Sequence, residues 1–339
     1  DFCLSRGLGD VYKRQTKNSL VSFLGTLVFI LNPNILYVQS TPLSETVCVV
    51  TFTAACYYFL VWVYDDGTPQ LIFAAAATFL ATLARYDGWP LYLAILVMVL
   101  IIGLMKKKSL VQIMANQILF GLLGGFGIVL WLIWNKIIFG DPLFFQHGPY
   151  SAQAQQTVFI RAHLLYPYHN LWAAIYAYSL DTIAIAGPVF FVLAIIAVAV
   201  FVLHHRLKPE TIGVMVFFVP FAFYVTSLYS GQAALFMPTL GLNHTLFNVR
   251  YGTQMVAPIA VCIAILAAYL KSRKRPGWSK LGQIGLVGII VAQTVGVATG
   301  GIITIQDGQY GVSCAPEHPI SVYLAQHYAG GKILEDVYT

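Results

Sequence analysis

Charged residues are scarce in this chain. Asp, Glu, Lys and Arg make up 9% of its 339 residues, whereas hydrophobic residues make up 58%. Because an ordinary soluble domain has about a quarter charged residues, a soluble globular protein is excluded. The composition predicts an all-α polytopic membrane protein.

Metal-binding and disulfide motifs are also missing. The five cysteines form no CxxC pair, and neither an HExxH motif nor a Cys/His finger spacing occurs. We therefore predict no disulfide framework and no set of metal ligands, and leave a divalent cation open as a cofactor. The formal net charge of +6 needs no nucleic-acid partner, because the basic surplus lies in short loops beside apolar segments and suits anionic lipid.

Nine apolar segments are long enough to cross a membrane, since about twenty residues span it and flanking side chains can snorkel. They are residues 19–37, 46–64, 70–84, 91–105, 110–138, 187–204, 211–230, 252–270 and 282–303. Residues 170–187 carry Trp172, Tyr176 and Tyr178, which suit a helix lying in the membrane interface. The glycines of residues 121–127 resemble a phosphate loop, but close helix packing explains them better inside a span.

Basic residues follow every second span from the fourth onward. Lys106, Lys107 and Lys108 end the fourth span, Arg206 and Lys208 follow the sixth, and five more lie within residues 271–280. Loops rich in Lys and Arg mark the cytoplasmic side. One threading places all three groups there and sends the unusual polar motifs to the outer face. We therefore expect the protein to act at the outer leaflet.

The two ends of the chain differ from the rest. Residues 1–15 lack apolar periodicity and resemble a translated sequencing adapter, so we expect them to be an artefact at the 5′ end of a truncated gene. We expect residues 16–305 to form the transmembrane domain, with its N-terminal part missing. Residues 306–339 are polar, and a turn followed by a strand is predicted from residue 330 onward. We expect them to begin an extracytoplasmic soluble domain.

Two polar motifs place ionisable residues at the outer ends of spans. Glu45 follows Ser44 in the first turn of the second span, where a functional site and simple capping by Ser44 explain it equally well. Arg85 lies in the motif Arg85-Tyr86-Asp87-Gly88-Trp89-Pro90, and its guanidinium group suits a phosphate. The alternatives for Arg85 are snorkelling and a salt bridge with Asp87, which can also cap the next helix.

Two further motifs reach the same face. Residues 140–156 contain an Asp-Pro turn followed by a run of aromatic, amide and hydroxyl groups, and such groups suit a sugar. Arg250, followed by Tyr251, lies where the eighth span begins. Arg85 and Arg250 could together clamp a lipid phosphate from both sides.

These motifs, together and in this order, resemble the GT-C superfamily of membrane glycosyltransferases, in particular bacterial and archaeal relatives of the protein O-mannosyltransferases of family 39. The resemblance rests on NPNILYVQSTPLSE, LARYDGWPLYL, FGDPLFFQHGPYSAQAQQ, FNVRYG and AQHYAGGKILEDV, and it covers most of residues 16–339. It implies a fold of many helices with an outward-facing cavity in a cytoplasmic membrane. It also implies inverting transfer of a sugar from a polyprenyl-phosphate carrier to a protein, lipid or glycan acceptor.

The resemblance also suggests roles for single residues. Glu45 would be the second acidic residue of the cavity, supported by Asp87, and Arg85, Arg250 and Tyr251 would bind the leaving phosphate. We assign sugar or acceptor contacts to Asn32, Tyr86, Asp141, His147 and Tyr150. The general-base Asp of the family would lie upstream of residue 16, and so we expect the chain as given to be inactive.

A transporter is the main alternative. Transporters bind their substrates near the midplane on broken helices, whereas these spans have few ionisable groups at mid-depth, and Gln293 is a rare polar residue there. A purely structural membrane protein would need neither two outer arginines nor a long aromatic loop. A polymerase or ligase of lipid-linked glycans would share the outer cavity, and the sequence hardly separates it from a transferase.

Overall fold

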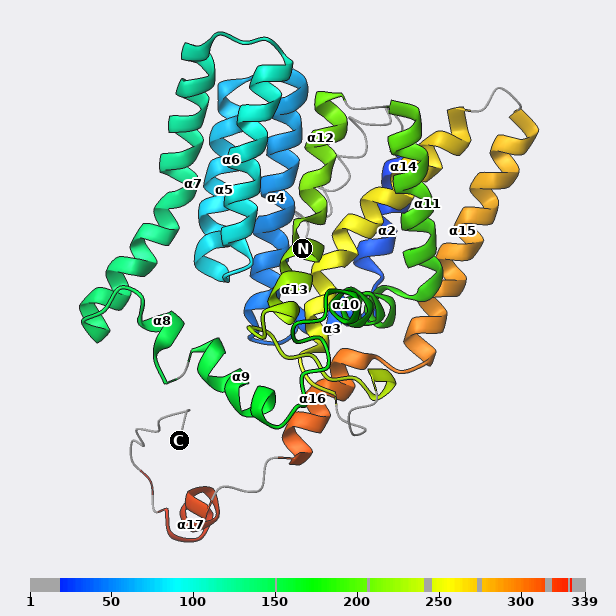
Figure 1. The fold of residues 1–339 in the computed structure, drawn as a ribbon. Coiled ribbons are helices and arrows are strands. Elements are labelled where there is room, and N and C mark those ends of the chain that lie inside the picture. The colour runs from blue at the N-terminus through cyan, green and yellow to red at the C-terminus, as the bar shows by residue number, and fades with distance from the viewer. Residues whose placement is uncertain are drawn as a thin grey trace.

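Helices dominate the chain (Figure 1). The computed structural model describes residues 19–149, 151–205, 208–240, 246–272, 276–314, 319–328 and 330. Within these ranges no strand forms, and the only extended pairing is an isolated bridge between Phe236 and Phe247. The prediction of an all-α fold is confirmed.

Among the described residues the elements are α-helices and three 3-10 helices, which lie between residues 216 and 255. They are α2 (Ser19–Ile30), α3 (Pro33–Val38), α4 (Ser44–Asp65), α5 (Thr68–Ala84), α6 (Gly88–Met105), α7 (Leu110–Phe139), α8 (Phe144–His147), α9 (Ala152–Arg161), α10 (Leu171–Ala186), α11 (Pro188–His205), α12 (Pro209–Met215), η1 (Val216–Phe218), α13 (Val219–Tyr229), η2 (Pro238–Leu240), η3 (Val249–Met255), α14 (Val256–Ser272), α15 (Pro276–Thr299), α16 (Ile303–Cys314) and α17 (Pro319–His327).

Six helical stretches among the described residues are long and apolar enough to cross a membrane. They are α4, α6, α7, Pro209–Tyr229, Val249–Leu270 and Leu281–Gln309. The bent pair Leu171–Ala186 and Pro188–Leu203, with an angle of 115°, makes a seventh if it is counted as one span. The predicted count of nine is therefore not confirmed, since α2 has 12 residues and α5 has 17.

The first predicted span, residues 19–37, is interrupted at Asn32. The Asn32 side chain accepts hydrogen bonds from the backbone of Asn34 and Ile35 and so caps α3. The Nδ2 groups of Asn32 and Asn34 also donate to the carbonyl of Ile185, at 2.9 and 3.1 Å. These bonds tie α3 to the last turn of α10, beside the bend into α11.

The predicted soluble domain of residues 306–339 is not confirmed. Residues up to Cys314 belong to α16 instead, and this helix is held to the bundle at its first turn. There the Thr304 amide and hydroxyl donate to Oδ1 of Asn34, at 3.2 and 2.9 Å. The strand predicted beyond residue 330 and the predicted artefact of residues 1–15 both lie outside the described residues.

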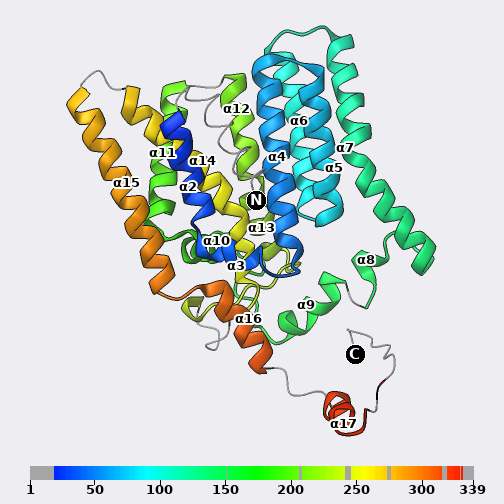
Figure 2. The ribbon, with the colours of Figure 1, turned by 180° about the vertical axis from the view of Figure 1, so that it is seen from behind.

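The helix ends fall into two sets (Figures 1 and 2). The α4–α5 and α6–α7 turns and the facing ends of α11, α12, α14 and α15 lie at one end, which we call the basic end. There Lys106 and Lys108 lie 3.0 and 2.8 Å from Oδ1 of Asp66. Partial burial raises the pKa of Asp66, but the hydrogen bonds from the two lysines outweigh it and hold the pKa below its usual value. The starts of α4 and α6 lie at the opposite end, which we call the polar end.

The glycines of residues 121–127 let α7 approach its neighbours closely. A Cβ atom on Gly127 would lie 2.3 Å from Oγ1 of Thr82 and 2.9 Å from the carbonyl of Phe79, both on α5. A Cβ atom on Gly125 would lie 2.9 Å from the ring of Tyr92 on α6. The interpretation of this run as a helix-packing surface is confirmed, because no larger side chain fits against α5.

Candidate functional site

Glu45 lies at the centre of an ionic network at the polar end. Its side chain is 2% exposed, and Oε1 accepts hydrogen bonds from Nη1 of Arg85 at 2.8 Å and from Nε of Arg250 at 2.7 Å. Capping by Ser44 is wrong, because α4 begins at Ser44 with no side-chain cap and the Ser44 hydroxyl accepts from Arg85 at 3.3 Å instead. One carboxylate oxygen thus joins two arginines from distant parts of the sequence.

Arg85 is presented by the tight turn between α5 and α6. The Gly88 amide donates to the carbonyl of Arg85 at 3.1 Å, and a Cβ atom on Gly88 would lie 2.4 Å from the Ala81 backbone. Only glycine fits this close approach. The Arg85 side chain therefore leaves the turn in a fixed direction, toward Glu45.

Asp87, in the same turn, holds Arg85 from a second side. Its Oδ2 atom lies 3.2 Å from Nε of Arg85 and accepts a hydrogen bond from the Tyr224 hydroxyl at 2.6 Å. The salt bridge with Asp87, one of the alternatives to phosphate binding for Arg85, is therefore present, whereas capping of α6 by the Asp87 side chain is wrong. Burial lowers the pKa of Arg85, but the charges of Asp87 and Glu45 outweigh burial and raise it.

Arg250 comes from η3, the short helix before α14. The preceding Asn248 has φ 61° and donates from Nδ2 to the carbonyl of Ala234 at 3.0 Å, which anchors the start of η3. Nη1 of Arg250 lies 3.9 Å from Oδ2 of Asp307 on α16. We call Glu45, Arg85, Asp87, Tyr224, Arg250 and Asp307 the arginine cluster.

Three tyrosine rings stack in a row that begins beside Arg85. The Tyr251 ring lies 5.8 Å from Cζ of Arg85 and 4.8 Å from the ring of Tyr224, which in turn lies 5.0 Å from the ring of Tyr178. The Tyr178 hydroxyl donates to the carbonyl of Tyr251 at 3.1 Å. Tyr178, predicted as an interfacial residue, is fully buried, whereas Trp172 of the same helix is 79% exposed.

The loop after α7 lies beside the Arg85 turn. Tyr86 is 44% exposed and stacks on Phe145, with the ring centroids 5.3 Å apart. Nε2 of His147 lies 2.5 Å from Oδ2 of Asp141. The hydrogen bond from the Leu143 amide lowers the pKa of Asp141 most, and the contact with His147 lowers it further. The structure thus brings Tyr86 next to the segment of Asp141 and His147, whereas Tyr150 lies outside the described residues.

Asp181, which the sequence analysis did not single out, is an acidic residue with a fully buried side chain. It lies on α10 with no exposed surface, and neither carboxylate oxygen has a hydrogen-bond partner of good geometry among the described residues. Its carbonyl oxygen would lie 3.0 Å from a Cβ atom on Gly252 of η3. A buried ionisable group in a membrane protein is a candidate for function.

Asn32 lies apart from the cluster's hydrogen bonds. Its side chain is 5% exposed and bonds to backbone groups of α3 and α10, which supports a structural role. Among the described residues no group of three or more His, Cys, Asp or Glu is placed to hold a metal ion.

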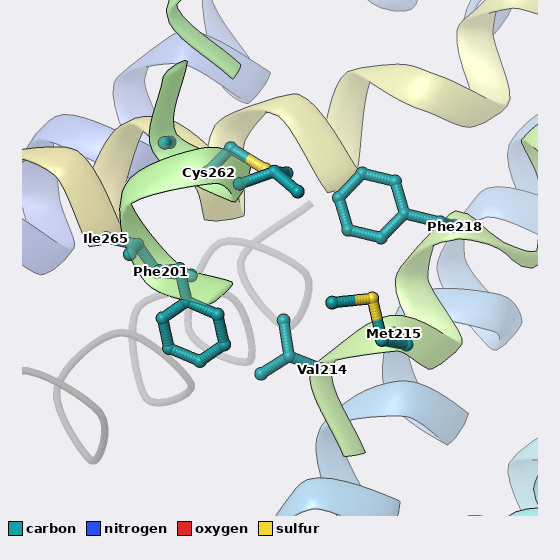
Figure 3. A pocket seen from close by; sticks show the side chains of 8 residues that line it. Phe201, Val214, Met215, Phe218, Cys262 and Ile265 are labelled. Atoms are coloured by element: carbon teal, nitrogen blue, oxygen red, sulfur yellow. The ribbon is translucent and has the colours of Figure 1, made fainter. Parts of the chain in front are cut away.

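A small cavity of about 10 Å³ lies elsewhere, between α11, α12, η1 and α14 (Figure 3). Figure 3 shows Phe201, Val214, Met215, Phe218 and Cys262 around it, and all of its lining residues are apolar. This space is far smaller than a ligand pocket, which is about 300–1,000 Å³, and its lining offers no hydrogen bonds to a sugar.

The arginine cluster can bind an oxyanion. Two guanidinium groups side by side match the oxygens of a phosphate, and the Arg85 and Arg250 side chains are 20% and 33% exposed. The structure brings together Glu45, Arg85, Asp87, Arg250 and Tyr251, which the sequence predicted as site residues. It adds Tyr178, Tyr224 and Asp307, which the sequence did not predict there. No local motif marks these three, because each contributes from a separate helix.

The part of the chain that the structure describes is all-helical, and six to seven of its helices could span a membrane. No protein-family model matches the chain, and neither a curated protein nor a solved structure is detectably similar to it.

Proposed function

We propose that this protein is a membrane glycosyltransferase. It moves a sugar, with inversion, from a polyprenyl-phosphate carrier to a protein, lipid or glycan acceptor at the outer face of the membrane. The observation that carries the proposal is the convergence of Arg85 and Arg250 on Glu45 at the polar end. The resemblance of the surrounding motifs to membrane glycosyltransferases adds to it.

The chemistry needs a positive site at the leaving group. The acceptor oxygen attacks the anomeric carbon, the bond from that carbon to the phosphate oxygen breaks, and a general base takes the acceptor's proton. Negative charge then grows on the departing phosphate. Arg85 and Arg250 stabilise this charge because Glu45 and Asp87 hold their guanidinium groups in place before the reaction.

Binding of the lipid phosphate tests the proposal without requiring turnover. The purified chain in phosphate-free detergent should bind a radiolabelled polyprenyl-phosphate sugar, and Arg85→Ala or Arg250→Ala should each weaken binding by at least about tenfold, since each removes charge-assisted hydrogen bonds. Arg161→Ala, at an exposed arginine of α9, is the matched control. Unchanged affinity in both cluster variants would refute the phosphate site.

Two observations favour a transporter as the second candidate. The α10–α11 pair is bent by 115°, and Asp181 is fully buried near the bend, with no hydrogen bond of good geometry to its carboxylate among the described residues. Broken helices and buried acids are features of ion-coupled transport. Solute uptake into vesicles that Asp181→Asn abolishes, together with lipid-phosphate affinity that Arg85→Ala leaves unchanged, would favour the transporter.

A further inference from the structure

We infer that the carboxylate of Asp307 occupies the place of the lipid phosphate beside Arg250 in the empty site and leaves it when the phosphate binds. The inference rests on the proposed function and names the group that the phosphate replaces. Oδ2 of Asp307, on α16, lies 3.9 Å from Nη1 of Arg250. The backbone amides of Val249 and Asn248 act on the same carboxylate. A guanidinium group and backbone amides are also the donors that bind a phosphate oxygen.

The charge of the cluster requires an exchange of anions. Glu45, Asp87 and Asp307 supply three carboxylates to two guanidinium groups. A phosphate that was simply added to this set would be repelled by the surplus negative charge. When the phosphate replaces the Asp307 carboxylate instead, one anion takes the position of another. The balance of charge around Arg250 then stays the same.

Asp307 is the carboxylate that the two arginines hold most weakly. Glu45 lies 2.7–2.8 Å from both guanidinium groups and is 2% exposed. Asp87 lies 3.2 Å from Arg85 and also accepts a hydrogen bond from the Tyr224 hydroxyl at 2.6 Å. The distance of 3.9 Å from Asp307 to its arginine is too long for a hydrogen bond. An incoming phosphate therefore displaces Asp307 before it displaces Glu45 or Asp87.

The position of Asp307 on α16 allows this displacement. Thr304, one turn earlier, fastens the helix through two hydrogen bonds to Asn34. Asp307 lies beyond this attachment, and Gly308, which follows it, is exposed. The carboxylate can therefore turn away while the first turn of α16 stays bound. Nη1 of Arg250 is then available to the charge that grows on the departing phosphate.

Binding of farnesyl phosphate to the purified chain, in phosphate-free detergent at one fixed pH, tests the inference. Asp307→Asn removes the charge of the competing group and keeps its volume, so the affinity should rise about tenfold. In an Arg250→Ala background the same substitution should have no effect, because the group for which the two anions compete is gone. Asp66→Asn, at the basic end, is the matched control and should leave the affinity unchanged.

Asp87→Asn separates displacement from a general loss of negative charge. It also removes one carboxylate from the cluster, but Asp87 holds Arg85 in place. We therefore expect Asp87→Asn to weaken binding, whereas Asp307→Asn tightens it. Equal tightening in the two variants would overturn the exchange and leave only an effect of net charge.

The outcomes separate the inference from the proposed function. Unchanged affinity in Asp307→Asn, together with binding that is lost in Arg85→Ala and Arg250→Ala, would overturn the exchange and leave the phosphate site intact. Binding that is insensitive to all three substitutions would overturn both. If Asp307→Asn tightens binding but phosphatidylglycerol displaces farnesyl phosphate as effectively as a polyprenyl-phosphate sugar does, the exchange stands. The site would then belong to a bulk phospholipid, which contradicts the proposed donor.

Discussion

Replacing Glu45 with alanine should lower the free energy of unfolding by about 3 kcal/mol. This is the lower end of the range for breaking a buried ion pair, because Arg85 keeps Asp87 as a partner while Arg250 keeps only Asp307 at 3.9 Å. Glu45→Gln retains the side-chain volume and one acceptor oxygen, so its loss should be smaller. Reversible unfolding by denaturant in detergent micelles measures both differences.

Glu210→Ala provides the matched control for Glu45→Ala. Both glutamates lie in the first turn of a helix, Glu45 in α4 and Glu210 in α12, and so both lose the same interaction with the helix dipole, which contributes about 0.3–1 kcal/mol. The excess loss in Glu45→Ala measures the bridge to the two arginines. Equal losses in the two variants would show that Arg85 and Arg250 do not depend on Glu45.

Gly88→Ala should disrupt both the α5–α6 turn and the binding of lipid phosphate. The added Cβ atom would lie 2.4 Å from the backbone of Ala81 and 2.5 Å from the amide of Thr82. No side-chain rotation relieves a clash with backbone, so the two helices must separate, at a cost of about 1–3 kcal/mol. Arg85 and Asp87 belong to this turn and would move with it, which should weaken binding of the polyprenyl-phosphate sugar.

Gly285→Ala separates the effect of the clash from the effect of adding a methyl group to a helix. A Cβ atom on Gly285 in α15 has nothing within 4 Å, and alanine is the better helix former by about 1 kcal/mol. We expect Gly285→Ala to match or exceed the native chain in stability and to leave lipid binding unchanged. A Gly88→Ala variant as stable as Gly285→Ala would contradict the close packing of the turn.

The helices and the polar end could be predicted from local sequence. Apolar runs identified the helices, and the glycines of α7 showed where it packs closely. Chain interruptions were harder to predict, because Asn32 stops one apolar run by capping a new helix. The predicted count of nine spans is not confirmed for this reason and because α5 has 17 residues.

The site could be predicted only in part. Glu45, Arg85 and Arg250 stood out because charge is scarce in the chain, and the threading placed them at one end. Their meeting at a single carboxylate oxygen depends on how α4, the α5–α6 turn and η3 pack together, which no local pattern records. The role of Tyr224 could not be predicted for the same reason, since its hydrogen-bond partner Asp87 lies on a distant segment of the chain.

A lipid phosphate in the outer leaflet can reach Arg85 and Arg250 only if the polar end faces outward and the basic end faces the cytoplasm. Single cysteines at exposed positions of the two ends can report this. Tyr86, 44% exposed, lies next to Arg85, and Lys107 lies in the α6–α7 turn. Cys48, Cys56 and Cys262 are buried and can remain, whereas Cys3 and Cys314 are replaced by serine.

The decisive measurement is labelling of these variants in intact cells with a membrane-impermeant maleimide. We predict that Tyr86→Cys is labelled from outside, and that Lys107→Cys is labelled only after the membrane is permeabilised. Labelling of Lys107→Cys but not Tyr86→Cys from outside would invert the threading, and labelling of both from one side would contradict it. In either case the arginine cluster could not receive a sugar donor from the outer leaflet.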